Sequence, residues 1–193
     1  LNADLTGLLL DCLAWGVTDP SSLRFLDAPP APALNEAWTL LAMLGALDGK
    51  GMLTEKGAAM RDLALPARLA AMVVAAAGAE DAFRRMLLAL LVTERGAAGT
   101  GVDIGHRLDT ALRGKGSQLA RLREMAKRNV SAMKLPRGGE VASAGAMLLD
   151  AYPDRVARSR GGSRHGSFVM ANGRGVAMDE TERLAGETFI VVA

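Results

Sequence analysis

Residues 34–55 read LNEAWTLLAMLGALDGKGMLTE, and this stretch decides how the first part of the chain folds. Leu34, Ala37 and Leu41 recur at the three- and four-residue spacing of one buried helical face. Gly45 stands just past the last of these positions, where a helix end favours a residue in the left-handed conformation. The pattern predicts an amphipathic helix that ends at Gly45.

A tight hairpin and a second helix are predicted directly after it. Asp48-Gly49 is a strong hairpin signal, and it would bring Leu47 and Leu53 opposite each other. Thr54 can then cap a helix that runs to Leu63. A helix followed by a small β-wing is typical of a winged-helix module, a fold that serves many functions and defines none of them.

Composition sets the broad class of the protein. Of 193 residues, 50% are hydrophobic and 4% aromatic, which suits a sizeable core of closely packed helices. The single cysteine, Cys12, excludes an internal disulfide and fits a reducing, cytoplasmic location. The longest apolar run, residues 86–92, is too short to span a membrane. Because the chain begins with leucine, we expect it to be part of a longer protein.

Beyond residue 65 the sequence predicts helices first and strands afterwards. Apolar stripes predict a four-helix bundle at residues 66–135, followed by a linker and one helix at 136–153. At 154–193, four short β-rich runs separated by turns predict a β-meander or a partial OB-like (oligonucleotide-binding) barrel. The expected fold class is mainly α (α+β), with the winged helix at residues 1–65 in front.

Basic residues are concentrated although the net charge is only +2. Residues 107–137 hold nine Lys or Arg against two Asp or Glu, a surplus typical of a surface that binds a polyanion. The helix predicted from Ser117 to Met133 carries much of it, with Glu124 able to pair with Arg128. A second arginine cluster follows in the β region. The candidate nucleic-acid-binding residues are Arg121, Arg123, Lys127, Arg128, Lys134, Arg158, Arg160, Arg164 and Arg174.

The alternative interpretation of these clusters is an ordinary solvated, charged surface. If they do bind nucleic acid, Tyr152 and Phe168 are the aromatic residues nearest in sequence to the second cluster, so contact with the phosphate backbone should outweigh base stacking. Such contact predicts weak sequence preference and strong dependence on salt.

Catalytic patterns are missing from the sequence. Gly114-Lys115-Gly116-Ser117 has the residue types of a phosphate-binding loop but neither its upstream glycine nor a preceding strand. His106 and His165 have no further ligands at metal-binding spacing, so no metal site is expected. Glu80 and Asp81 are interpreted as solvated residues at a helix start. We expect no catalysis and no cofactor in this chain alone.

Several motifs resemble a known family. FLDAPP (25–30), LGALD (44–48), LTEKG (53–57) and LPARLAAM (65–72) follow the order and spacing of the winged-helix and helicase-associated region of DEAH-box helicases. LLDAYPDRVARSRG (148–161) and FVMANGRG (168–175) resemble the bacterial HrpB-type branch more narrowly. The resemblance spans nearly the whole chain.

The resemblance implies a C-terminal accessory region of an ATP-dependent helicase. In that family two RecA-like lobes carry the ATP and Mg²⁺ chemistry, and none of their motifs stands in this sequence. In the same family, a helical bundle known as a ratchet and an OB-like barrel line one side of the nucleic-acid channel. The resemblance therefore implies the missing lobes and a single strand of RNA or DNA as partners, with no membrane involved.

Two other functions remain open. A winged-helix DNA-binding regulator would need a basic recognition helix, but the helix at residues 34–44 carries Glu36 and neither Lys nor Arg. A protein-interaction scaffold would use the basic surfaces to dock an acidic partner. Binding to duplex DNA or nuclease-resistant co-purification would distinguish these two.

Overall fold

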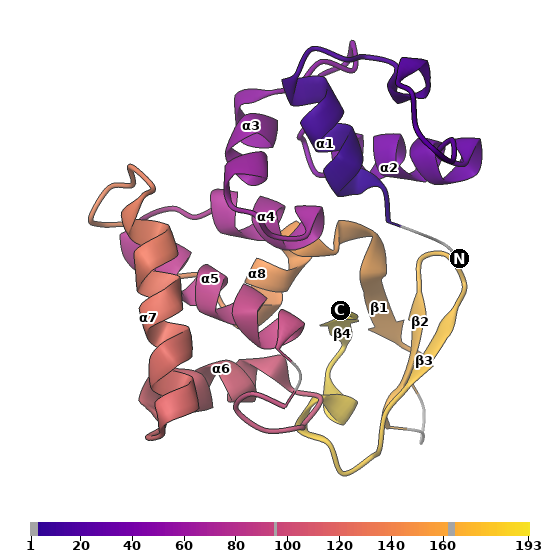
Figure 1. The fold of residues 1–193 in the computed structure, drawn as a ribbon. Helices are drawn as coiled ribbons and strands as arrows, with labels where there is room; N and C mark the ends of the chain where they lie inside the picture. The colour runs from indigo at the N-terminus through magenta and orange to yellow at the C-terminus, as the bar shows by residue number, and fades with distance from the viewer. Residues whose placement is uncertain (1–3, 95, 162–164) are drawn as a thin grey trace. The chain divides into compact units, whose positions relative to one another are not determined.

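The helix, hairpin and helix predicted from residues 34–55 are present in the computed structural model (Figure 1). Helix α2 spans Ala31–Met43, and helix α3 spans Glu55–Asp62. Gly45 has a φ of +73°, as a left-handed helix end requires. The Thr54 hydroxyl accepts a hydrogen bond of 3.0 Å from the Gly57 amide, which confirms the predicted cap.

The turn between these helices is wider than the sequence indicated. Leu47 and Leu53 pair in an antiparallel bridge, as predicted. The residue with a left-handed φ inside the turn is Gly51, at +77°, rather than Gly49. The Asp48 carboxylate accepts hydrogen bonds from the amides of Lys50 and Met52 and so organises the turn.

The structure describes residues 4–94, 96–161 and 165–193 and forms two units, Leu1–Val74 and Ala75–Ala193. Besides α2 and α3, the first unit holds helix α1 (Thr6–Ala14), the 3₁₀ helix η1 (Pro20–Ser22) and helix α4 (Ala67–Val74). Its core joins residues from all four α-helices: Leu9, Leu10, Leu13, Ala37, Leu41, Leu44, Ala46, Leu47, Met60, Ala67, Ala70 and Ala71.

Helix α4 groups with the first unit, whereas the sequence placed it in the bundle after residue 65. The small side chains of Ala67, Ala70 and Ala71 let α4 pack closely in the same core as Met60 of α3. The four-part domain division stays a prediction.

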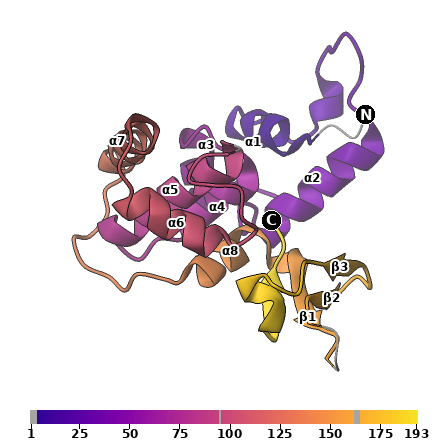
Figure 2. The ribbon, with the colours of Figure 1, turned by 90° about the horizontal axis from the view of Figure 1, so that it is seen from below.

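Helices form one part of the second unit (Figure 2). They are α5 (Ala79–Thr93), α6 (Ile104–Arg113), α7 (Ser117–Ser131) and α8 (Ala144–Ala151). Helix α5 packs against both α6 and α7, and α8 packs against α6 and the C-terminal strand. Asp103 and Ser143 cap α6 and α8, while Gly116 stands at the N-cap position of α7, without a side-chain hydrogen bond.

An antiparallel sheet completes this unit. Its strands are β1 (Val156–Ser159), β2 (Ser167–Met170), β3 (Gly175–Ala177) and β4 (Phe189–Val191), in the order β3-β2-β1-β4. The short 3₁₀ helices η2 (Pro153–Arg155) and η3 (Arg183–Gly186) flank β1 and β4. One face forms a small core around Ala157, Phe168 and Ile190.

The predicted fold class, mainly α (α+β), is confirmed. The four β-rich runs are all strands, and the first three form a meander to which β4 adds beside β1. The more specific names winged helix, ratchet and OB-like barrel stay predictions. None of the helices within the described ranges has the length and apolar run that a membrane crossing would need.

Candidate nucleic-acid interface

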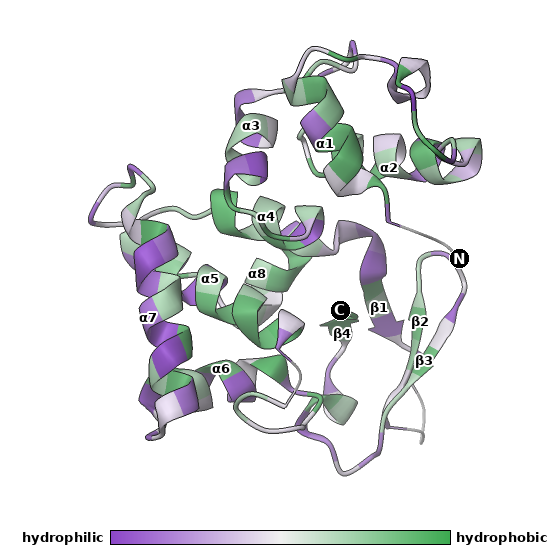
Figure 3. Ribbon diagram, in the orientation of Figure 1, coloured by the Kyte–Doolittle hydropathy of each residue, from purple (hydrophilic) through white to green (hydrophobic). Residues whose placement is uncertain are grey.

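Helix α7 carries the first predicted basic surface. Leu122, Ala126 and Val130 are buried, so the opposite side of the helix is left to solvent. Broad hydrophilic bands along α7 contrast with the largely hydrophobic α8 in Figure 3. The basic residues exposed on α7 are Arg121, Lys127 and Arg128, which we call the α7 face.

One acidic residue interrupts this face. Glu124 pairs with Lys127, with 3.0 Å between Oε1 and Nζ, rather than with Arg128 as the sequence suggested. Both side chains are more than half exposed, so the pair is only weakly held and can exchange for a phosphate. Helix α7 ends at Ser131 rather than at Met133, so the exposed Lys134 lies beyond the helix and outside the α7 face.

Arg123 has a structural role that the sequence did not reveal. Its Nη1 donates to the carbonyl oxygens of Ala111 and Gly114, at 2.6 and 3.0 Å. These carbonyls lie at the C-terminal end of α6, where a positive charge is favoured. The Arg123 side chain is half-buried and joins the end of α6 to α7, so its guanidinium is less available to a ligand than its neighbours.

Replacing Arg123 by methionine is expected to lower the free energy of unfolding by about 1.5–3 kcal/mol, because two hydrogen bonds from a charged group are lost. Affinity for a single strand should barely change. The matched control Arg128→Met, at an exposed position, should change stability by no more than about 0.5 kcal/mol and weaken binding. Denaturant unfolding measures the change in stability, and fluorescence anisotropy measures the change in affinity. If Arg128→Met lost more stability, or Arg123→Met lost more affinity, the structural role of Arg123 and the binding role of Arg128 would be contradicted.

The second predicted basic surface lies on the sheet. Arg158 is exposed on β1, with Val169 and Phe189 as its register partners on β2 and β4. Arg160 follows β1, and its Nε makes a long hydrogen bond of 3.5 Å to the Phe168 carbonyl. Arg174 is exposed in the β2–β3 turn. We call Arg158, Arg160 and Arg174 the sheet cluster; Arg164 lies outside the described residues.

The two basic surfaces do not merge. Figures 1 and 2 show α7 on one side of the second unit and strands β1–β3 on the other, with α5 and α8 between them. The structure places Arg158 and Arg160 on β1 and just after it, and Arg174 in the turn between the neighbouring strands β2 and β3 of the same sheet. It leaves the α7 face as a separate patch.

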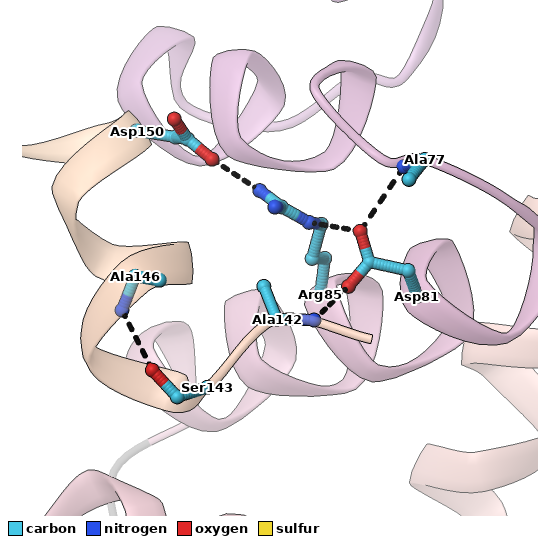
Figure 4. A network of polar contacts seen from close by, with 7 residues as sticks. All are labelled: Ala77, Asp81, Arg85, Ala142, Ser143, Ala146 and Asp150. Carbon is cyan, nitrogen blue, oxygen red and sulfur yellow. Dashed lines mark hydrogen bonds and ion pairs between the residues drawn. The ribbon is translucent and has the colours of Figure 1, made fainter. Parts of the chain in front are cut away.

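A buried charge network fixes the elements between these surfaces (Figure 4). The side chains of Asp81 and Arg85, one helical turn apart on α5, are 1% and 6% exposed. Arg85 Nε donates to Asp81 at 2.8 Å, and Arg85 Nη1 donates to Asp150 on α8. Asp81 also accepts hydrogen bonds from the amides of Ala77 and Ala142. The network therefore joins α5 to α8, the helix that packs against strand β4.

The sequence interpretation of Asp81 as a solvated residue was wrong. Burial alone would raise the pKa of Asp81, but hydrogen bonds from Ala142, Arg85 and Ala77 outweigh it and hold this pKa below its ordinary value. A pattern could have indicated the network, because Asp81 and Arg85 stand i, i+4 inside a stripe that is otherwise apolar. Glu80 does lie at the surface, where it pairs with Arg84.

Asp81 should make stability depend on acid. Since its pKa is lower in the folded state, the unfolded state binds the proton more tightly, and its contribution is complete above the ordinary pKa near 3.8. That contribution is lost as the pH falls through the lower, folded value. In denaturant unfolding, wild type should exceed Asp81→Asn most at pH 6 and progressively less towards pH 3.

The exposed Asp179 is the matched control for this experiment. Hydrogen bonds from the Thr181 hydroxyl and amide lower its pKa, but water can replace them, so Asp179→Asn should have little effect at any pH. A stability gap between wild type and Asp81→Asn that stays constant from pH 6 to pH 3 would contradict the assignment.

Known proteins resemble this chain both in sequence and in fold. No protein-family model matches the chain. Its sequence and fold nevertheless resemble one region of a bacterial DEAH/RHA helicase, in agreement with the resemblance that the motifs from residue 25 to residue 175 indicated. One protein that it resembles is the ATP-dependent RNA helicase HrpB of Escherichia coli (strain K12), with 35% identity over 194 residues.

Solved structures agree with this homology. Crystal structures described as E. coli DExH-box NTPase HrpB and E. coli DEAH/RHA helicase HrpB each match with a TM-score of 0.80 and 32% identity. They cover 97% and 98% of this chain. The chain spans 22% of the length of the curated relative, and 22% and 23% of the two crystallised chains.

Proposed function

We propose that this chain is an accessory, strand-guiding part of an ATP-dependent helicase. The homology to HrpB along the whole chain supports the helicase assignment. The observation that carries the guiding role is the exposure of Arg121, Arg128, Arg158 and Arg174 on two surfaces of one unit. Phosphates of a single strand are the ligand that such arginines recognise most readily.

ATP and Mg²⁺ belong, in this proposal, to RecA-like lobes that the chain does not contain. The segment GKGS at residues 114–117 does not fit the phosphate-binding loop of an ATP site. Residues 114–117 join α6 to α7, so the sequence GKGS follows a helix rather than the strand that a phosphate-binding loop needs. The contribution of this chain would be to position the strand, while the lobes supply the hydrolysis.

Reversing the charge of each surface separately tests the proposal. Arg121→Glu with Arg128→Glu, and Arg158→Glu with Arg174→Glu, should each weaken binding of a fluorescein-labelled 20-nucleotide single strand by at least about tenfold. The control Arg61→Glu is in the first unit, where Arg61 pairs with Asp11. It should leave binding within about twofold of wild type. Equal affinity of wild type and both reversed variants would overturn the guiding role.

A duplex of the same length and sequence distinguishes the other functions. Preference for the single strand supports the helicase role, and RNA and DNA versions reveal which one the chain prefers. Specific protection of a duplex would instead favour the DNA-binding regulator. Absence of binding to either, with capture of an acidic protein that resists nuclease, would favour the interaction scaffold.

A further inference from the structure

Phe189 is an exposed aromatic residue at the edge of the sheet. The aromatic residues nearest in sequence to the second cluster are unavailable for stacking, because Phe168 is fully buried and Tyr152 is only 7% exposed. Arg155 also covers the Tyr152 ring, at 5.3 Å from its centre. Phe189 on β4, by contrast, is 60% exposed. It belongs to an apolar run that the sequence predicted as a strand without indicating which side chains meet solvent.

Arg158 stands directly beside Phe189. The two residues are register partners on β1 and β4, so their side chains leave the same face of the sheet, with Cβ atoms about 5 Å apart. This face is the one opposite the core of Ala157, Phe168 and Ile190. An exposed ring beside an exposed guanidinium offers a flat apolar surface for a base and a charge for the adjoining phosphate.

A cavity of about 540 Å³ opens next to the ring. Phe189, Val156 and Val191 contribute to its wall from the sheet, and the first residues of α6 and α8 contribute from the other side. Its volume lies within the range of small-ligand pockets. Because Val156 and Arg158 are two residues apart on β1, the arginine leaves the same face of the sheet as the valine that lines the cavity.

The charge of the cavity decides which part of a nucleotide fits it. Among the residues that the structure describes, its lining includes the acidic Asp103 and Glu187 and contains neither Lys nor Arg. A phosphate is therefore disfavoured inside. A neutral base is compatible with this lining, because carboxylate oxygens accept hydrogen bonds from the amino groups of bases. The phosphate would remain outside the cavity, within reach of Arg158.

We propose that Phe189 and Arg158 form a nucleotide subsite, in which a base of a single strand stacks on Phe189 while Arg158 holds the adjacent phosphate. This subsite deepens the proposed function and rests on it. It adds base stacking to a surface from which the sequence predicted mainly backbone contact. It also assigns a role to β4, the strand that ends the sheet.

The experiment compares two oligonucleotides of equal length and charge, one with bases and one abasic, each made as RNA and as DNA. Phe189→Ala and Phe189→Leu should each weaken binding of the base-bearing strand by at least about fivefold, the lower end for stacking one base. Phe189→Leu serves as the closer comparison, because leucine keeps the apolar volume but loses the aromatic face. Both variants should leave binding of the abasic strand unaffected, because that strand has no base to stack. Arg158→Gln should weaken both strands equally.

Trp15 provides a matched control, because it is an aromatic residue that is 72% exposed in the first unit. Trp15→Ala should bind both strands as wild type does. The subsite is overturned if Phe189→Ala weakens both strands equally or neither, even though wild type binds them in a salt-dependent manner. If wild type binds neither strand, the proposed function itself fails, and the two failures are therefore distinguishable.

Discussion

Replacing Arg85 by methionine should lower the free energy of unfolding of the second unit by about 3–5 kcal/mol, since it leaves a buried carboxylate without its charged partner. Asp81 is 1% exposed, and its remaining hydrogen bonds come from backbone amides that carry no full charge. Asp150 also loses its link to α5. Hydrogen exchange in peptides from α5 and α8 measures the loss of stability in the second unit. Tryptophan fluorescence would report on the first unit instead, because both tryptophans lie there.

The neighbouring residue is the control for this variant. Arg84 pairs with Glu80 at 3.0 Å, but their side chains are 38% and 58% exposed, so Arg84→Met should cost no more than about 1 kcal/mol. Adding Asp81→Asn to Arg85→Met should recover part of the lost stability, because it removes the unpaired charge. If Arg85→Met were as mild as Arg84→Met, the network would not be what holds α8 in place.

Gly78→Ala should destabilise the second unit by about 3 kcal/mol, because the chain crosses itself too closely there for a side chain. A Cβ atom on Gly78 would lie 1.7 Å from the carbonyl oxygen of Gly138, so the backbone must shift. That shift would break the hydrogen bond of 3.0 Å from the Ala79 amide to the Pro136 carbonyl. It would also displace the Ala142 amide, which donates to Asp81 at 3.0 Å.

Gly138 itself supplies the matched control. A Cβ atom there meets nothing within 4 Å, and its backbone is not left-handed, so Gly138→Ala should be neutral or stabilising by up to about 1 kcal/mol. Thermal unfolding of the two variants measures the difference. Equal melting temperatures for Gly78→Ala and Gly138→Ala would contradict the close crossing.

Local signals made much of the fold predictable. The helix, hairpin and helix around Gly45 and Thr54 were correct because caps and turns depend on residues only a few positions apart. The width of the hairpin was missed, since Asp48 bonds across four residues to Met52 instead of forming a two-residue turn. The grouping of α4 with the first unit depends on packing, which no periodicity reveals.

The candidate site was predicted less completely, because exposure is set by long-range contacts. Arg121 and Arg128 are exposed as expected, but Arg123 bonds to the end of a different helix. The burial of Asp81 was not predicted because it depends on contacts between distant segments. The Ala142 amide bonds to Asp81, and Arg85 bonds to Asp150, and the two residues of each pair are more than 60 positions apart. The exposure of Phe189 was not predicted, because the sequence of a short apolar strand does not reveal which of its faces meets solvent.

The salt dependence of single-strand binding tests the central claim, that exposed arginines of this chain hold the phosphates of a single strand. The logarithm of the association constant should fall linearly with the logarithm of salt concentration, with a slope of about −0.7 for each phosphate contacted. The fourfold variant Arg121→Gln, Arg128→Gln, Arg158→Gln and Arg174→Gln should reduce the steepness of that slope by about 2 to 3. A slope near zero for wild type, or one left unchanged in the variant, would contradict the account.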